Sequence, residues 1–331
     1  MPCGLAPVLT LCGRHDCCSA SAAAMHSPSS SRLCWYRRAA AMAEITHGVT
    51  DPTEYVQFWN DTLAVKFNRF RHILMDGLSY HSRVPLGNLA LAPGARVVDV
   101  GCGWGDTALA LAEKTGAQGY VLGIDCVDDF LERAREEARR RALHNVDFVA
   151  ADVERYPFQP AFDMAFSRFG MMFFENPVAA MRNVRSALRP GGELMFIVWR
   201  DVEDNPWLGL PKEVVLDYLP PPGEDARTCG PGPFSMANPE VVTRQLEIAG
   251  FGDIGFERID GPVTVGDSLD DAIAFQLAIG PAGEVFREAG EVAAQRRDEI
   301  EQALAEALRP YLDQGKVVMP SSSWCISARR D

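Results

Sequence analysis

Three glycines stand at alternate positions where a predicted strand meets a predicted helix. They are Gly101, Gly103 and Gly105 in the stretch RVVDVGCGWGDTALALA, residues 96–112. Glycine weakens regular structure, so its repeated use here indicates a backbone that bends sharply or lies against a ligand. A glycine-rich turn after a parallel strand is a nucleotide-binding position, because backbone approaches the ligand closely and the next helix offers its N-terminal amides.

The charges beside these glycines argue against a nicotinamide dinucleotide. The dinucleotide fingerprint Gly-x-Gly-x-x-Gly needs its third glycine where this chain has Asp106. Asp106 and Asp99, which precedes the first glycine by two residues, are poorly suited to a pyrophosphate. They suit a ligand that carries positive charge. An NAD-dependent oxidoreductase is kept as an alternative function.

Residues 90–200 resemble class I S-adenosylmethionine-dependent methyltransferases, in particular the small-molecule branch that includes quinone-biosynthesis enzymes. The first motif of that family, acid-x-Gly-x-Gly-x-Gly, stands here as residues 99–105, and the segments FDMAFSRFGMMFF and LRPGGELMFIVW also match. The resemblance implies S-adenosylmethionine as cofactor, with Asp125 on the ribose hydroxyls and Asp152 at the adenine, beside Val153. The expected cofactor-binding residues are Asp99, Gly101, Cys102, Gly103, Gly105, Asp125, Cys126, Asp152, Val153 and Ser167.

Local structural roles are the alternative for two of these acids. Asp99 alone would also serve to cap the next turn, and Asp125 would also serve as N-cap of the helix from Val127. Their placement at the ends of successive strands along one sheet edge favours the cofactor.

Methyl transfer from a sulfonium is an in-line displacement with an activated donor, so the protein mainly positions the acceptor and excludes water. A general base is needed only if the acceptor holds its proton. We expect His81 as the base, because histidine titrates near neutrality, with Tyr80 adjacent. Arg168, at the end of the predicted fourth strand, suits an anionic acceptor group. Packing or exposure is the alternative for the histidine, and no metal site is predicted.

Strands and helices alternate with short connections, which predicts an α/β fold: a Rossmann-like class I methyltransferase whose mostly parallel, seven-stranded sheet carries helices on both faces. The predicted strands are 95–100, 120–125, 146–152, 161–168, 193–199, 253–260 and 316–330. The predicted helices are 53–78, 106–116, 127–143, 176–189, 238–250, 268–279 and 283–309.

Three further segments complete the predicted organisation. Residues 42–90 are expected to form an N-terminal helical lid, and residues 91–331 the methyltransferase domain. Insertions in that domain are expected at about 202–235, predicted as a long Pro/Gly-rich loop, and 266–312. Residues 1–41 are expected to be a disordered extension, compatible with a transit peptide, a weak signal peptide or a start at Met42.

Charge and cysteine usage limit the partners. The net charge is −13; residues 1–41 contribute +3, from four arginines and one aspartate, so the remainder carries −16. Such a surface repels nucleic acid and favours a small-molecule acceptor. No apolar run is long enough to span a membrane. Five of the nine cysteines lie in residues 1–41 and the others are widely spaced, which indicates a reducing cytoplasm, with organellar import if the extension is a transit peptide.

Three questions stay open at this level. The sequence names neither the acceptor nor the atom that receives the methyl group, and it does not give the oligomeric state. A non-catalytic protein that binds S-adenosylmethionine is the other alternative, since the cofactor motifs say nothing of an acceptor.

Overall fold

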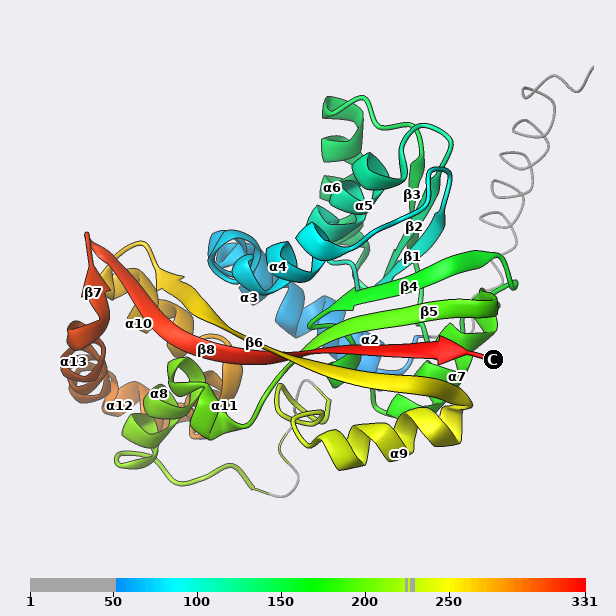
Figure 1. Ribbon diagram of the computed structural model, residues 1–331. Helices are drawn as coiled ribbons and strands as arrows, with labels where there is room; N and C mark the ends of the chain where they lie inside the picture. Colours follow the sequence, from blue (N-terminus) through cyan, green and yellow to red (C-terminus); the bar gives the residue numbers. More distant parts are fainter. Residues whose placement is uncertain (1–51, 224–225, 227–229) are drawn as a thin grey trace, which may run out of the picture. The chain divides into compact units, whose positions relative to one another are not determined.

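A mostly parallel sheet runs through the part of the chain that the computed structural model describes, residues 52–331 without 224–225 and 227–229 (Figure 1). Its strand order is β3-β2-β1-β4-β5-β8-β6, and the short β7 pairs with β8. The strands are β1 Arg96–Val100, β2 Tyr120–Asp125, β3 Val146–Ala150, β4 Phe162–Arg168, β5 Leu188–Trp199, β6 Phe251–Gly266, β7 Leu312–Asp313 and β8 Lys316–Arg330. The seven predicted strands are confirmed, and β7 adds a two-residue strand that the sequence did not indicate.

The first five strands pair in parallel, and β8 runs antiparallel to β5 and β6. Parallel strands are buried on both faces, which explains their continuous apolar runs. On β1, Val97 packs with residues of α5 (Asp106–Thr115) and α6 (Asp128–Arg140). Val98 and Val100 pack in the core of the other face, with residues of α7 (Pro177–Ala187) and α9 (Pro239–Ala249). Helices on both faces are therefore confirmed.

The N-terminal helices are shorter than predicted. The expected helix 53–78 is divided into α2 Glu54–Phe58, the π-helix η1 Trp59–Leu63, α3 Ala64–Arg69 and the π-helix η2 Ile73–Gly77, and α4 Tyr80–Asn88 follows. Phe70 leaves helical backbone angles (φ −104°, ψ 24°) with its side chain buried. Burial of large side chains against the rest of the protein thus overrides the regular helical period of this segment.

The predicted loop at 202–235 is wrong in its first half. Residues 202–204 form the 3₁₀ turn η4 (Val202–Asp204), and α8 covers Pro206–Leu216. Pro206 stands in the first turn of α8, where a missing N–H costs nothing. Trp207, Leu208 and Val215 are buried, so tertiary packing supplies the stability that the proline-rich sequence lacks.

The helical segment after β6 also differs from its prediction. The expected helices 268–279 and 283–309 are α10 Leu269–Gln276, α11 Gly280–Glu288, α12 Gly290–Gln295 and α13 Arg297–Leu308. The breaks fall at Gly290, whose φ is +54°, and at Arg296, which leaves helical angles. In Figure 1 these helices lie at the far end of the long ribbon made by β6 and β8.

Three smaller elements complete the fold: η3 Met171–Phe173 after β4, the 3₁₀ turn η5 Arg309–Tyr311, and the β7–β8 turn. Among the described residues, no helix has the length and apolar content needed to cross a bilayer. The expected extension at 1–41 lies outside the described residues.

Gly105→Ala should destabilise the protein by about 2–4 kcal/mol, because the site combines a left-handed backbone with tight packing. The φ of Gly105 is +80°, and an added Cβ would lie 2.8 Å from Cβ of Ala134 and 2.9 Å from Cε1 of Phe148. Urea unfolding measures the effect. Gly87→Ala is the control, since nothing lies within 4 Å of its added Cβ and φ is not positive; equal stability of the two variants would contradict the account.

Candidate active site

A cavity of about 230 Å³ opens at the carboxyl ends of the central strands. A water molecule needs only about 10–15 Å³ by this kind of measure, so the cavity accommodates a small organic molecule. Its walls include the glycine turn after β1, the ends of β2, β4 and β5, the segment after β3, the N-terminal helices, and α8, α10 and α11. The carboxyl edge of a parallel sheet is the usual ligand position in such folds.

The glycine turn approaches the cavity with its backbone. Gly101 and Gly103 line the cavity, with φ values of +65° and +53°, where residues with a side chain are strained. A Cβ at Gly101 would lie 3.1 Å from Cα of Gly170, in the turn after β4. Gly105 is not among the lining residues; it faces α6 and β3 instead. The glycine-rich sequence predicted that backbone lies close to a ligand site. Gly101 and Gly103 bring backbone to the cavity in this way, and Gly105 does not.

Asp125 links the glycine turn to the end of β2. Its Oδ2 accepts a hydrogen bond from the backbone N–H of Gly103 at 2.8 Å, and its Oδ1 accepts from that of Val127 at 3.0 Å. Burial raises the pKa of this carboxyl, and the hydrogen bonds from backbone amides oppose that shift. α6 begins at Asp128 with Val127 as its N-cap, so Asp125 closes the turn before the helix without being the cap. The carboxylate lines the cavity and has lone pairs left for a ligand.

Four more of the expected cofactor residues line the same cavity: Cys102, Cys126, Asp152 and Val153. Asp152 follows β3, and its Oδ1 accepts a hydrogen bond from the N–H of Glu154 at 2.9 Å. Burial raises the pKa of both cysteine thiols well above its usual value, so they line the wall as neutral thiols.

Asp99 and Ser167 are not among the residues that line the cavity. Each forms a hydrogen bond inside the protein next to the glycine turn. The carboxyl of Asp99 is fully buried and accepts a hydrogen bond from the hydroxyl of Thr107 in α5 at 2.6 Å. Burial raises its pKa to about 7. The hydroxyl of Ser167 donates to the carbonyl of Val100 at 2.7 Å. Both side chains tie neighbouring elements together at the base of the glycine turn.

His81 lies outside the residues that line the cavity and is held between two serines. Nε2 of His81 lies 2.7 Å from Oγ of Ser321, and Nδ1 lies 2.7 Å from Oγ of Ser323. The hydroxyl of Ser321 donates to the carbonyl of Gly261, so it accepts from Nε2–H of the imidazole. The hydroxyl of Ser323 then donates to Nδ1, and the neutral ring is fully paired.

Burial lowers the pKa of His81 to about 4, which makes it a weak base at neutral pH. Its ring packs edge-on against Trp199, a wall of the cavity, with ring centroids 5.0 Å apart. The ring of Tyr80, also outside the lining residues, packs against Gly261, where a Cβ would lie 2.1 Å from Cδ1 of the tyrosine. The structure therefore gives both residues packing contacts, and it gives neither a contact with the cavity.

Arg168 is the one expected catalytic residue that lines the cavity. Its Nη2 lies 2.9 Å from Oδ1 and 2.8 Å from Oδ2 of Asp106, at the start of α5. The side chains are 10% and 23% exposed, so this ion pair is largely removed from water. Asp106, whose charge argued against a pyrophosphate and for a positively charged ligand, also lines the cavity.

Aromatic and aliphatic side chains make the rest of the wall. Phe169 stacks on Trp199 with ring centroids 3.9 Å apart, and its backbone has a φ of +57°. A left-handed non-glycine residue is a local strain that surrounding structure must hold. Trp207 of α8 and Phe275 of α10 continue this wall. Sequence reasoning missed four lining residues, because their spacing resembles that of any packed helix: Phe275 on α10, Ile279 just before α11, and Glu284 and Arg287 on α11.

The N-terminal helices contact the loops that hold the glycine turn. Nε1 of Trp104 donates to Oδ1 of Asn68 at 3.0 Å, and the side-chain amide of Asn60 donates to the carbonyl of Cys126 at 3.0 Å. Tyr55 and Trp59 line the cavity. These helices thus complete one wall of the cavity; their action as a lid stays a prediction.

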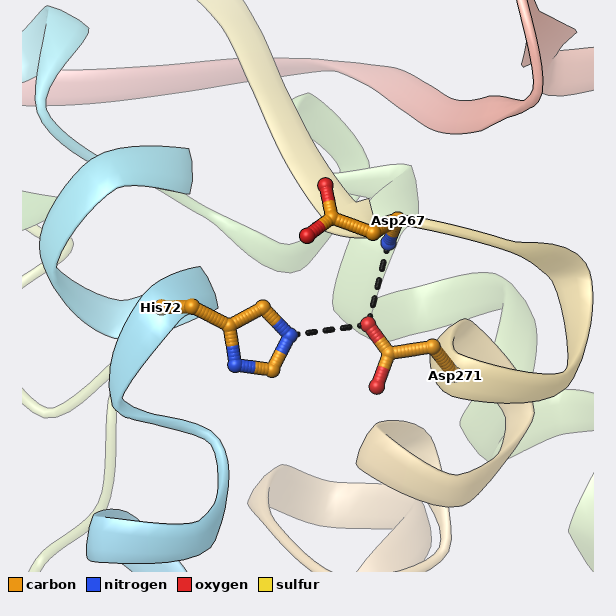
Figure 2. Close-up of side chains that lie close together, drawn as sticks. All are labelled: His72, Asp267 and Asp271. Carbon is orange, nitrogen blue, oxygen red and sulfur yellow. Dashed lines mark hydrogen bonds and ion pairs between the residues drawn. The ribbon is translucent and has the colours of Figure 1, made fainter.

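Metal-ligating residue types also meet away from this cavity, at His72, Asp267 and Asp271 (Figure 2). Oδ2 of Asp271 accepts from Nε2 of His72 at 2.8 Å and from the backbone N–H of Asp267 at 3.0 Å. The ammonium of Lys316 lies 2.6 Å from Oδ1 of Asp267. Donors of the protein already bind these carboxylates. We interpret the cluster as a contact between the helical residue before η2 and the segment that joins β6 to α10, with the first turn of that helix.

Comparisons with known proteins agree with this geometry. Residues 91–214 match the family model described as a methyltransferase domain. Aklanonic acid methyltransferase of Streptomyces sp. strain C5 is 36% identical over 104 residues, 31% of this chain and 47% of that protein. Demethylmenaquinone methyltransferase of Staphylococcus aureus strain JH9 is 25% identical over 215 residues, 61% of this chain and 86% of that protein. The matched region spans about half the length of the first of these relatives.

Solved structures show the same fold. Phosphoethanolamine N-methyltransferase 2 of Haemonchus contortus in complex with S-adenosyl-L-methionine has a TM-score of 0.52 and 17% identity, covering 86% of this chain and 61% of that chain. The YcgJ protein of Bacillus subtilis has a TM-score of 0.50 and 17% identity, covering 75% and 96%. At these identities the likeness establishes the Rossmann-like fold alone.

The buried His81 predicts a pH-dependent stability. Its folded pKa of about 4 lies below the ordinary value of 6.5, so between these values the unfolded chain binds more protons. The stability contribution is present above pH 6.5 and is lost as the pH falls toward 4, by about 3 kcal/mol in total. His81→Gln removes the pH-dependent contribution of the histidine to stability. The titration of Asp99 contributes equally to the wild type and to this variant. Urea unfolding from pH 4 to 7 should show the two stability curves converging or crossing at low pH; parallel curves would contradict the burial argument.

Proposed function

We propose that this chain, which carries a methyltransferase domain of Rossmann-like fold, transfers a methyl group from S-adenosylmethionine to a small, partly apolar organic acceptor. One observation carries the proposal. Asp125, the last residue of β2, and Asp152, which follows β3, line the same cavity as the backbone of Gly101 and Gly103. The cavity thus has both exposed backbone from the glycine turn and carboxylates from the carboxyl edge of the sheet.

The charges of the cavity fit that cofactor. S-adenosylmethionine carries a sulfonium and an ammonium group and no phosphate. Carboxylates of Asp106, Asp125, Asp152 and Glu284 line the cavity, against the guanidinium groups of Arg168 and Arg287. A net negative lining attracts a cationic ligand and repels a pyrophosphate. An NAD-dependent oxidoreductase is disfavoured for the same reason.

The resemblance assigns a role to each side of the cavity. Asp125, held by two backbone N–H groups, is oriented to accept hydrogen bonds from ribose hydroxyls with its remaining lone pairs. Asp152 and Val153 are expected beside the adenine. Gly101 and Gly103 leave room for the methionine portion because they carry no side chain.

When bound, the cofactor supplies an electrophilic methyl group, so this chain needs to hold the acceptor in line and keep water out. Trp199, Trp207 and Phe275 form an apolar surface for the acceptor. The N-terminal helices cover the cavity beside Trp104. We include their action as a lid in the proposal, since they contact both the glycine turn and the end of β2.

A non-catalytic protein would keep the cofactor half of this cavity and lose the acceptor half. The apolar wall from β5, α8 and α10 encloses space beyond the glycine turn, which supports an acceptor. The named methyltransferase relatives act on small molecules such as aklanonic acid and demethylmenaquinone, by their names. The acceptor of this chain is proposed only as a class.

Asp125→Ala should lower the affinity for S-adenosylhomocysteine by about 10- to 100-fold, because a hydrogen bond to a charged group contributes about 1.5–3 kcal/mol. Isothermal titration of the full chain with S-adenosylhomocysteine measures the change, with circular dichroism as the test of folding. Asp128→Ala is the matched control, an exposed acid at the start of α6 that does not line the cavity. Unchanged affinity in folded Asp125→Ala would contradict the assignment of the ribose site.

A further inference from the structure

A carboxylate of α11 lines the cavity without a hydrogen bond from the protein. Glu284 stands in the middle of α11 and is partly buried in the cavity wall. Among the described residues, no group donates a hydrogen bond to its carboxylate, and no cation lies within ion-pair distance of it. Both oxygens keep accessible surface, unlike the buried unpaired oxygen of Asp99. A molecule in the cavity can therefore place a hydrogen-bond donor on Glu284.

The other acidic groups of the wall already have partners. Asp106 is paired with Arg168, and Asp125 and Asp152 accept hydrogen bonds from backbone N–H groups. The two cysteine thiols of the wall are neutral, and His81 lies outside the lining. Among the described residues, Glu284 is therefore the carboxylate of the wall that has both oxygens available to a ligand.

Glu284 lies on the side of the cavity that we propose for the acceptor. α11 packs against α8, beside which it lies in Figure 1. At the start of α11, a Cβ on Gly280 would lie 2.9 Å from Cδ2 of Leu208 in α8. Trp207, the residue before Leu208, and Phe275 belong to the apolar wall of the cavity. The carboxylate thus comes from the same group of helices as this wall, and the glycine turn comes from the sheet.

The surroundings of Glu284 favour its protonated form. Burial is the main cause that raises the pKa of this carboxyl; Arg287 lowers the pKa, Glu288 raises it and Lys212 of α8 lowers it. Among the described residues, α10 and α12, which also pack on α11, add no charged group to this set. A carboxylate with a raised pKa holds a proton more strongly, which makes it a better general base.

Arg287 places a positive charge on the same wall. It follows Glu284 by three residues, so the two side chains share one face of α11, and both line the cavity. The guanidinium carbon lies 5.7 Å from the ring centroid of Phe58 in α2. Burial and, to a smaller extent, the charge of Arg287 lower the pKa of Lys66 in α3. This positive charge stabilises a negative oxygen and repels an ammonium group, so the pair suits a hydroxyl.

We propose that Glu284 accepts the proton of an acidic hydroxyl, a phenol or an enol, on the methyl acceptor. This inference rests on the proposed function and names the class of its acceptor. As the proton moves to the carboxylate, the electron pair of the O–H bond stays on oxygen, which forms the bond to the methyl carbon. The carbon–sulfur bond breaks, and its pair remains on sulfur as a neutral thioether. Glu284 then gives its proton to water.

The experiment compares the full-length chain in three forms: wild type, Glu284→Gln and the control Glu213→Gln. Glutamine keeps the size of glutamate and one acceptor oxygen, but it takes no proton at neutral pH. Glu213 is an exposed residue of the neighbouring α8 that does not line the cavity. Circular dichroism and melting temperature establish folding. Affinity for S-adenosylhomocysteine should differ by less than about 2-fold among the three forms, because Glu284 is assigned to the acceptor.

Titration of the protein saturated with S-adenosylhomocysteine tests recognition of the hydroxyl. The probes are 2-naphthol and 2-methylnaphthalene, which share an apolar ring and differ in one group. Glu284→Gln should bind 2-naphthol about 5- to 10-fold more weakly than wild type does, because a charged acceptor forms the stronger hydrogen bond. Affinity for 2-methylnaphthalene should be the same in all three forms.

Single-turnover methylation of 2-naphthol with labelled S-adenosylmethionine tests the proton transfer. At neutral pH, Glu284→Gln should be slower than wild type by about 100-fold or more. The wild-type rate should fall as the pH falls through the raised pKa of Glu284, and the variant should lack this fall. Toward pH of about 10, where a phenolic hydroxyl ionises without a base, the rate of the variant should approach that of wild type. A structural defect would not be repaired in this way.

A weaker hydroxyl contact, together with a rate defect that high pH repairs, supports the assignment. Four results overturn it: equal effects on the two probes, a rate defect that persists at high pH, equal rates at neutral pH, or no transfer to 2-naphthol by wild type. Loss of affinity for S-adenosylhomocysteine in folded Glu284→Gln also overturns it, because Glu284 would then belong to the cofactor site. Failure of the wild type to bind S-adenosylhomocysteine would instead contradict the proposed function, and the assignment with it.

Discussion

The turns after β1 and β4 touch each other through their backbones, and this contact determines where the cavity lies. A Cβ at Gly101 would meet Cα of Gly170 at 3.1 Å, and one at Gly170 would meet the carbonyl oxygen of Val100 at 2.9 Å. The loops after β1 and β4 therefore lie closer than side chains would permit. Ser167 holds this contact by its hydrogen bond to Val100. Because the contact is fixed, Arg168 and Phe169 emerge directly beside the glycine turn.

Elements with strong local patterns were predictable, and those that depend on distant packing were not. The β-branched run at 96–100 is buried on both faces of the sheet, and its pattern was sufficient to predict β1. α8 was predicted as loop because its prolines dominate the local pattern, yet Pro206 fits a first turn and Trp207 is buried by α10 and β5 partners. One helix was predicted over 283–309 where the structure has α11, α12 and α13, since Gly290 alone does not indicate a left-handed break.

The part of the cavity that we propose for the cofactor has residues that were largely predictable from the sequence, because its geometry follows strand order. Residues at the ends of successive parallel strands meet at one edge, so Asp125 and Asp152 were predictable together. Side-chain direction was not predictable in the same way. Asp99 faces α5 through Thr107, and Gly105 faces Phe148, although both belong to the motif. A motif identifies the turn, and packing decides which of its members reach the cavity.

The part of the cavity that we propose for the acceptor depends on elements far apart in the chain. Phe275 and Glu284 come from helices inserted between β6 and β8, and their approach to Trp199 has no local signal. His81 was predicted as a base from its residue type, whereas its contacts with Ser321 and Ser323 bury it as a neutral ring. The lining at this end of the cavity is set by tertiary structure rather than by composition.

Hydrogen–deuterium exchange with and without S-adenosylhomocysteine is the measurement that we would make first, because it locates the bound ligand on the unmodified protein. We expect the new protection to include the three loops at residues 101–107, 125–128 and 151–154, which converge on the cavity. Protection of these loops by NADH but not by S-adenosylhomocysteine, or protection that leaves all three unchanged, would contradict it.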